Sequence, residues 1–201
     1  MTQIEVRRAG VADLDLLVPL FDAYRQFYQQ PSDPALARRF LAERIERNES
    51  VIFLALAGAG AGAGTGASAG AGAGAGPATA ARPDAGAGPA TAVRPDTAAD
   101  TAARARPPAE PAGFTQLYPI FSSTRCRRSW LLNDLFVAPA WRAAGVARRL
   151  MEAARRHGVE TGAWEIELMT AHANTPAQAL YESLGYELDR EFRHYVLRLE
   201  R

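Results

Sequence analysis

Apolar residues follow strand-like and helix-like patterns in two separate parts of the chain. In the first part, residues 4–9 alternate weakly, as in a short strand, and residues 51–57 are almost wholly apolar, as in a buried strand. Between them, apolar residues recur at helical spacing over two stretches, and Asp33-Pro34 is typical of a helix start. The first part therefore predicts a strand, two helices and a strand.

The second part begins at Gly113 and predicts five more strands and two helices. The predicted strands are 114–121, 130–137, 165–170, 186–188 and 192–199, and the predicted helices run from 146 to about 158 and from 175 to 184. Strands joined by short connections favour antiparallel pairing, whereas strand-helix-strand units favour parallel pairing. We therefore expect an α/β fold with a mixed, mostly antiparallel sheet flanked by helices.

Composition changes abruptly between the two parts. Residues 58–76 are almost pure Ala and Gly, and residues 73–84 recur as 85–96 with a single change. Such a segment has little apolar bulk to bury and much backbone entropy to lose. We expect residues 58–112 to be a disordered, low-complexity Ala/Gly/Pro insertion within a single domain over 1–201. Every glycine of its repetitive part lies at an even position, which excludes the dinucleotide motif Gly-x-Gly-x-x-Gly.

The overall composition excludes several classes of protein. The net charge is +1, so nothing favours nucleic acid or an anionic membrane as a partner. Cys126 is the single cysteine, and no apolar run is long enough to span a bilayer. No signal peptide is expected, so we predict a cytoplasmic protein. The three histidines have no metal-ligand spacing, so no metal is expected; a homodimer remains open as an assembly.

The most informative stretch is the turn after the apolar strand that ends at Val137. There the sequence reads Arg142-x-x-Gly145-x-Ala147 and continues as a helix. Backbone N–H groups at such a turn, together with the positive end of the helix, can bind a phosphate group. Small side chains would let the phosphate approach, and the residues placed to contact it are Arg142, Ala143, Ala144, Gly145, Val146 and Ala147.

Three motifs together resemble the GNAT superfamily of acetyl-CoA-dependent N-acetyltransferases. They are Leu-Asn-Asp-Leu-Phe-Val ending at Val137, the turn just described, and Asn174-x-x-Ala-x-x-x-Tyr181 followed by Gly185-Tyr186. The resemblance covers roughly residues 113–199. It implies a GNAT-like fold, acetyl-CoA as co-substrate, and transfer of acetyl to a primary amine of a small molecule by direct attack in a ternary complex.

The resemblance also implies roles for individual residues. The main chain of Leu135, Phe136 and Val137 would pair with the acetyl and pantetheine arm, and the turn would hold the pyrophosphate. Asn174 would bind that arm, although Asn is also a preferred helix cap. Tyr181 would be the general acid that protonates the leaving thiolate, the alternative being a tyrosine of the core.

Several alternatives stay open from the sequence. Asn133 and Asp134 alternate along the strand, so one of them should face the acceptor; Asp134 is a weak candidate base that we do not assign. Tyr24, Phe27 and Tyr28 are either helix-to-sheet packing or a wall of the acceptor pocket. A non-catalytic acyl-CoA-binding regulatory module and a protein N-terminal acetyltransferase are the alternative functions.

Overall fold

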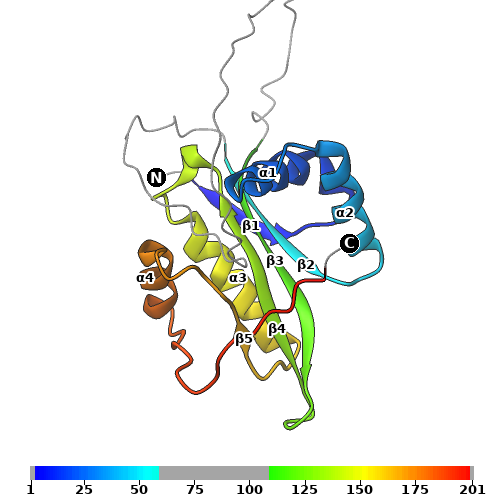
Figure 1. The fold of residues 1–201 in the computed structure, drawn as a ribbon. Helices are drawn as coiled ribbons and strands as arrows, with labels where there is room; N and C mark the ends of the chain where they lie inside the picture. The colour runs from blue at the N-terminus through cyan, green and yellow to red at the C-terminus, as the bar shows by residue number, and fades with distance from the viewer. Residues whose placement is uncertain (1–2, 59–108, 200–201) are drawn as a thin grey trace, which may run out of the picture.

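A computed structural model describes residues 3–58 and 109–199 of the 201-residue chain (Figure 1). Within these ranges one sheet has the strand order β1-β2-β3-β4-β5, antiparallel throughout except for the parallel pair β4–β5. The strands are β1 (Ile4–Arg8), β2 (Val51–Ala57), β3 (Glu110–Ser122), β4 (Arg127–Val137) and β5 (Ile166–Glu167). The helices are α1 (Leu14–Phe27), α2 (Pro34–Glu46), α3 (Val146–Glu160) and α4 (Thr175–Ser183), with short 3₁₀ turns at Val11–Asp13 and Pro139–Trp141. The predicted mixed α/β fold is confirmed.

Helices cover both faces of the sheet (Figure 1). On one face, α1 and α2 pack on a core that includes Phe21, Leu41 and Phe114. On the other, α3 and α4 pack on a second core that includes Leu135 and Leu150. Each helix buries its apolar side while the intervening positions stay polar, as the helical spacing predicts. No helix in the described ranges is long and apolar enough to cross a membrane.

The predicted insertion connects two neighbouring strands. Ala57, the last residue of β2, is the ladder partner of Glu110, the first residue of β3. Residues 110–112, which we had expected in the insertion, therefore belong to β3, because they extend its pairing with β2. Residues 59–108 lie outside the described residues, so the expectation of disorder concerns a segment that the structure does not describe.

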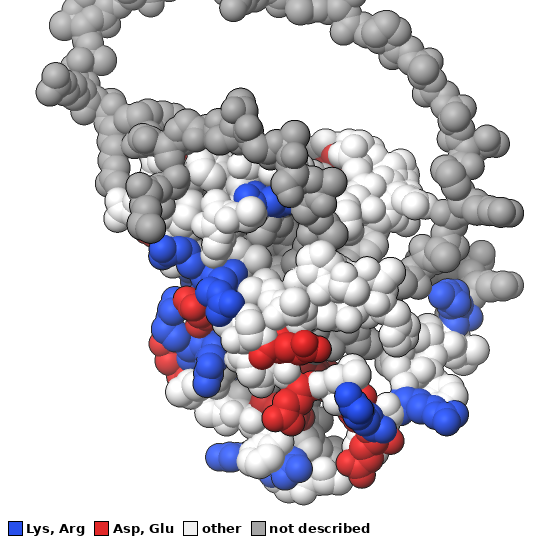
Figure 2. Space-filling model, turned by 90° about the vertical axis from the view of Figure 1, so that its left-hand side faces the viewer, with Lys and Arg blue, Asp and Glu red and all other residues white. Residues whose placement is uncertain are grey.

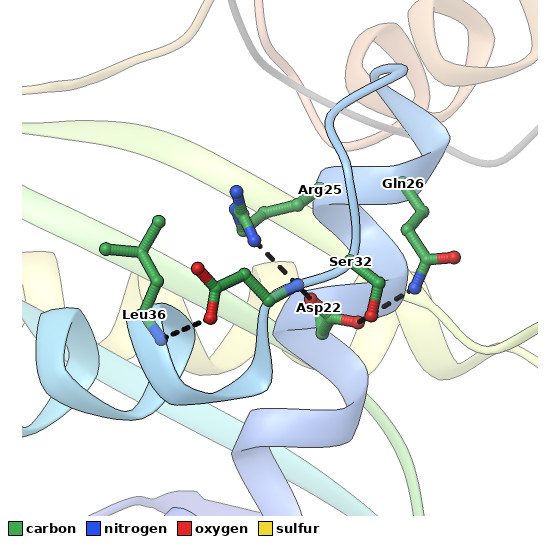
Figure 3. Close-up of polar contacts among 6 residues, drawn as sticks. Asp22, Arg25, Gln26, Ser32 and Leu36 are labelled. Carbon is green, nitrogen blue, oxygen red and sulfur yellow. Dashed lines mark hydrogen bonds and ion pairs between the residues drawn. The ribbon is translucent and has the colours of Figure 1, made fainter.

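A buried carboxylate joins the end of α1 to the start of α2 (Figure 3). Asp22 accepts hydrogen bonds from Ser32 Oγ at 2.6 Å, Gln26 Nε2 at 2.8 Å and the Asp33 backbone N–H at 2.8 Å. These donors lower the pKa of Asp22 below its usual value, with the Ser32 hydroxyl as the largest cause. Asp33 in turn caps α2 by accepting from Leu36 N at 2.9 Å. The network holds the α1–α2 connection in one conformation.

The sheet ends earlier than the sequence predicts. The strand expected over 165–170 is only the two-residue β5, and the strands expected at 186–188 and 192–199 do not form. A strand requires a neighbouring ladder, and β5 pairs with only Trp130 and Leu131 of β4. Residues 192–199 therefore alternate as a strand would but have no partner strand among the described residues. Their apolar side chains are left exposed, and those of Tyr195 and Leu197 are 82% and 85% exposed.

Candidate active site

Strands β4 and β5 separate soon after they meet. Their ladder consists of Trp130 with Ile166 and Leu131 with Glu167. Beyond Leu131, no described strand pairs with this edge of β4, although its other edge stays paired with β3 as far as Val137. Successive residues of an antiparallel strand direct their N–H and C=O groups to opposite edges. At least one residue of 135–137 therefore presents backbone hydrogen-bonding groups to the open edge.

The side chains of Leu135, Phe136 and Val137 are all buried in the core. Leu135 and Val137 are buried on the α3 face, and Phe136 is buried against α1. Only their main chain can contact a ligand, which is the role that the sequence resemblance implies for them. A bound molecule with amide groups would extend the sheet at this edge as an additional strand does.

The turn after β4 presents backbone donors to solvent. Gly145 adopts a left-handed conformation with φ of 78°, and apart from its chain neighbours no atom of the described residues lies within 4 Å of where its Cβ would be. Glycine is therefore required here by backbone conformation, and the space beside it is open. α3 starts at Val146, and no side chain in the described part of the chain caps its first turn. The N–H groups of that turn are thus available to an anion.

The individual turn residues differ in how they are placed. Ala143, Ala144 and Gly145 are exposed, whereas the Val146 side chain is buried in the core, so Val146 can offer only its backbone. The Arg142 Nε lies 3.4 Å from the Val137 carbonyl oxygen, which keeps the guanidinium near the end of β4. The predicted phosphate-binding turn is thus assembled around one exposed surface.

Two predicted site residues, Asn174 and Tyr181, both lie near Thr170, which the sequence analysis did not single out. Asn174 occupies the cap position of α4, but its side chain does not cap the helix. Its Nδ2 instead donates to Thr170 Oγ1 at 3.1 Å. Burial raises the pKa of the Tyr181 phenol and the nearby Thr170 hydroxyl opposes that rise, although the Tyr181 hydroxyl has no hydrogen-bond partner among the described residues. Thr170 therefore lies beside both Asn174 and Tyr181. The signal in the sequence that could have indicated it was a polar side chain four residues before Asn174.

Tyr181 is almost completely enclosed. Its side chain is 4% exposed and lies in the same core cluster as Leu135 and Val137. Burial is the largest cause that raises the pKa of its phenol above the usual value, so the hydroxyl stays protonated throughout the physiological range. A protonated hydroxyl in the core cluster that also contains Leu135 and Val137 can act as a proton donor.

A second ionisable group lies on the α1 face of β4. Asp134 is 4% exposed, and its carboxylate accepts hydrogen bonds from the Tyr24 hydroxyl and from Asn133 Nδ2 at 3.0 Å. Burial outweighs these donors and raises the pKa of Asp134 to about 6. Burial raises the pKa of Tyr28 and of Tyr118, and the charge of Asp134 raises both further, so both phenols lie near it. Tyr24 and Tyr28 thus border a polar group as well as packing on the sheet.

The expected alternation of Asn133 and Asp134 across the sheet is wrong. Gln116 pairs with Asp134 and the next residue, Leu117, pairs with Leu132, so Asn133 is an extra residue in β4. Such a bulge breaks the two-residue period of side-chain directions. The amide of Asn133 consequently reaches the carboxylate of its neighbour, and both side chains contribute to one polar cluster.

Replacing Asp134 by Asn should stabilise the protein at neutral pH. A carboxyl whose pKa is raised from 3.8 to about 6 on folding binds its proton more tightly in the folded state. Its contribution to stability is complete below pH 4 and is lost as the pH rises through 6, a difference of about 3 kcal/mol. Urea unfolding at pH 7.5 should therefore show a free energy of unfolding about 1–2 kcal/mol higher for Asp134→Asn, because the buried amide also costs some stability.

Measurements at lower pH and a charge-matched variant complete this test. The advantage of Asp134→Asn should shrink as the pH falls from 6 to 4, because the wild-type carboxyl becomes protonated there. Asp15→Asn removes the same charge from a side chain that is 84% exposed, and should change stability by less than about 0.5 kcal/mol. An Asp134→Asn protein that is less stable than the wild type at pH 7.5 would contradict the assigned burial effect.

Other charged residues near these elements have structural partners. Arg148 donates to Ser183 Oγ at 2.7 Å and so ties α3 to α4. Arg125 lies over the ring of Trp164 at 4.1 Å, at the β3–β4 hairpin tip and so at the opposite end of β4 from the turn. On the face shown in Figure 2, basic and acidic side chains of the described residues are interspersed. Among these residues, no group of three His, Cys, Asp or Glu side chains is placed to bind a metal ion.

Comparisons with known proteins agree with this geometry. The sequence profile described as "Acetyltransferase (GNAT) family" matches residues 92–186. A Bacillus subtilis (strain 168) protein named "Uncharacterized N-acetyltransferase YhfO" is 34% identical over 194 residues, which are 96% of this chain and 97% of that protein. An Arabidopsis thaliana protein named "L-ornithine N5-acetyltransferase NATA1" is 26% identical over 82 residues, 41% of this chain and 36% of its own.

A solved structure extends the similarity to the whole fold. The crystal structure of a probable acetyltransferase superimposes with a TM-score of 0.69 at 32% sequence identity, covering 98% of this chain and 99% of that one. On the strength of these matches, the chain belongs to the GNAT family of N-acetyltransferases, which use acetyl-CoA as the acetyl donor.

Proposed function

We propose that this enzyme acetylates the primary amine of a small molecule, and that the amine attacks acetyl-CoA directly in a ternary complex. One observation carries the proposal. Leu135 and Val137, which lie where β4 has an open edge, share a core cluster with Tyr181 and belong to the same strand as Asp134. A thioester held along that edge would have a proton donor on one side. The acceptor would approach from the α1 face, where the carboxylate and the tyrosines lie.

The two ends of this edge suggest how acetyl-CoA is bound. The main chain of Leu135, Phe136 and Val137 would pair with the acetyl and pantetheine arm, because their side chains are buried and only the backbone is available. The N–H groups of the turn over 142–147 would hold the pyrophosphate at the uncapped start of α3. Asn174 would bind the pantetheine amides from the opposite side, since its side chain is directed away from the helix it precedes.

Tyr181 is proposed as the general acid. When the amine nitrogen bonds to the acetyl carbon and the carbon–sulfur bond breaks, the departing thiolate must receive a proton. Burial keeps the Tyr181 hydroxyl protonated, and the Thr170 hydroxyl lies near it. Backbone N–H groups of β4 would stabilise the negative charge that develops on the carbonyl oxygen.

An acceptor screen tests the function. We expect thiol release from acetyl-CoA to depend on added amine, and to be at least about tenfold faster with some small primary amines than with peptides that carry a free N-terminus. Amino acids with side-chain amines belong in the panel because the Arabidopsis relative is named an ornithine N5-acetyltransferase. Turnover of peptides alone would support a protein N-terminal acetyltransferase, and coenzyme binding without turnover of any amine would support a non-catalytic module.

A further inference from the structure

The end of the β3–β4 hairpin carries three arginines that have no acidic partner. Arg125, Arg127 and Arg128 are exposed, and none of them forms an ion pair with another described residue. No Asp or Glu occurs between Pro111 and Asn133. In α1 and α2, by contrast, most arginines contact an Asp or Glu. Three like charges so close together repel one another, so folding alone does not account for the cluster.

Aromatic rings hold these three guanidinium groups. The Cζ of Arg125 lies 4.1 Å from the centroid of the Trp164 ring, and that of Arg127 lies 5.9 Å from the same centroid. The Cζ of Arg128 lies 5.4 Å from the ring centroid of Phe121, its partner across the ladder. A guanidinium over a ring is attracted to the ring face, and its N–H donors lie along its own edge. The arginines can therefore offer paired donors to a carboxylate.

Apolar surface accompanies the charges. Phe121 is 71% exposed and Trp164 is 44% exposed, although arginines lie over both rings. Two backbone hydrogen bonds fix the Trp164 loop to β4, since Trp164 N donates to the Arg128 carbonyl oxygen at 2.8 Å and Trp130 N donates to that of Glu165 at 3.0 Å. The hairpin end, which we define as residues 121–128 together with Trp164, is therefore one surface of fixed shape. Such a surface loses little conformational entropy when it binds a partner.

The hairpin end is separate from the residues proposed to bind acetyl-CoA. In Figure 1 the β3–β4 hairpin extends beyond the helices at the lower end of the molecule. Along β4, Arg128 is roughly 20 Å from Leu135, at the rise expected for a strand. The turn over 142–147 follows the other end of β4. The three arginines therefore form a second anion-binding surface.

We propose that the hairpin end is a docking surface for a short acidic protein segment in which carboxylates flank an aromatic or large aliphatic side chain. The carboxylates would pair with the edges of the three guanidinium groups. The apolar side chain would pack against the exposed parts of Phe121 and Trp164. This combination matches both the charge and the apolar area of the surface.

The same residues fit a nucleic acid or a membrane less well. A nucleic-acid strand is usually bound along an extended basic groove, whereas basic and acidic side chains of the described residues are interspersed on the face shown in Figure 2. A hairpin that enters a membrane needs apolar residues at its tip, and the turn here begins with Ser123, Thr124 and Arg125. The size and composition of the hairpin end therefore favour a short protein segment.

Fluorescence anisotropy with a labelled synthetic peptide tests the proposal. The probe carries Asp and Glu residues on both sides of a central Phe, and the control peptide carries Asn and Gln in their places. We expect the acidic peptide to bind with a dissociation constant of about 10–100 µM, and at least about tenfold more tightly than the control peptide. Binding should weaken as the salt concentration rises from about 50 to 300 mM, because exposed charge pairs are screened.

Two variants with the same loss of charge separate the hairpin end from the net charge of the protein. The hairpin variant combines Arg125→Gln, Arg127→Gln and Arg128→Gln, and should bind the acidic peptide at least about tenfold more weakly. The control variant makes the same change at exposed positions in or directly after α2, and should bind it within about threefold of the wild type. The control substitutions are Arg38→Gln, Arg39→Gln and Arg47→Gln.

Phe121→Ala tests the apolar contact while keeping all three arginines. Because the Phe121 ring is 71% exposed, its removal should leave the thermal unfolding midpoint of the protein nearly unchanged. The dissociation constant of the acidic peptide should rise about fivefold, since the central Phe of the peptide loses part of its apolar contact. An unchanged dissociation constant would refute the apolar half of the surface.

Three further results would overturn the proposal. The first is equal affinity of the wild type and the hairpin variant, or an equal loss in both triple variants, because binding would then not depend on the hairpin end. The second is no saturable binding of the acidic peptide up to about 1 mM. The third is tighter, arginine-dependent binding of an oligouridine or of phosphatidylserine vesicles, which would assign the surface to a nucleic acid or a membrane. Acetyl transfer enters none of these measurements, so the proposed function stands or fails separately.

Discussion

Tyr181→Phe should lower kcat by about 10²–10³-fold while leaving coenzyme A binding within threefold of the wild type. The substitution removes only the hydroxyl, and the ring remains in a core site that is 4% exposed. Without the hydroxyl, the thiolate must leave unprotonated or take its proton from water, so the bond-breaking step slows. The steady-state rate of thiol release from acetyl-CoA gives kcat, and isothermal titration calorimetry with coenzyme A gives the dissociation constant.

Tyr186→Phe is a matched control for this variant. The Tyr186 ring centroid lies 6.1 Å from that of Tyr181, and its residue follows α4 at the rim of a small pocket between α3 and α4. It undergoes the same loss of a hydroxyl in the same region of the fold. We expect kcat within about threefold of the wild type. If Tyr181→Phe shows the same small effect, the general acid must be another group.

Gly113→Val should destabilise the fold by about 3 kcal/mol and weaken the use of acetyl-CoA. A Cβ at position 113 would lie 2.5 Å from the carbonyl oxygen of Phe136 and 3.2 Å from the Cα of Val137. Both contacts are backbone, so β3 and β4 must separate where they are paired. That displacement moves the residues whose outer edge is proposed to hold the acetyl arm, and the KM for acetyl-CoA should rise at least fivefold.

Urea unfolding and a glycine control test this expectation. Gly10 has no positive φ, and apart from its chain neighbours no atom of the described residues lies within 4 Å of its Cβ position, so Gly10→Ala should change the stability of the protein by less than about 1 kcal/mol. A Gly113→Val protein with a wild-type unfolding midpoint would show that the two strands can separate there without cost. A destabilised protein with an unchanged KM would show that the acetyl arm is bound elsewhere.

Local patterns predicted those elements whose formation depends mainly on neighbouring residues. The helical spacing before and after the insertion, Asp33-Pro34 at the start of α2, and the glycine at the start of α3 all act over a few residues. The left-handed conformation of Gly145 is a backbone requirement that only glycine meets easily. Tyr181 lies on the buried side of α4, which likewise follows from the helix period.

Patterns that depend on distant partners were predicted less well. The alternating residues 192–199 have the period of a strand, yet they do not form one, because the short β5 offers no ladder to continue. The bulge at Asn133 could not be anticipated from β4 alone, since a bulge is defined by the register with β3. A strict two-residue period along β4 therefore predicted that Asn133 and Asp134 lie on opposite faces of the sheet.

The sequence by itself determined the mixed α/β class, the resemblance to the GNAT family, the turn at 142–147 and the candidates Asn174 and Tyr181, because each depends on residues close together in the chain. Only the tertiary structure decided that Tyr24 reaches Asp134 and that Thr170, hydrogen-bonded to Asn174, lies near the hydroxyl of Tyr181. It also decided that β4 keeps an open edge beyond Leu131. Contacts between α1, β4 and α4 depend on how the helices pack across the sheet, and no local period encodes that packing.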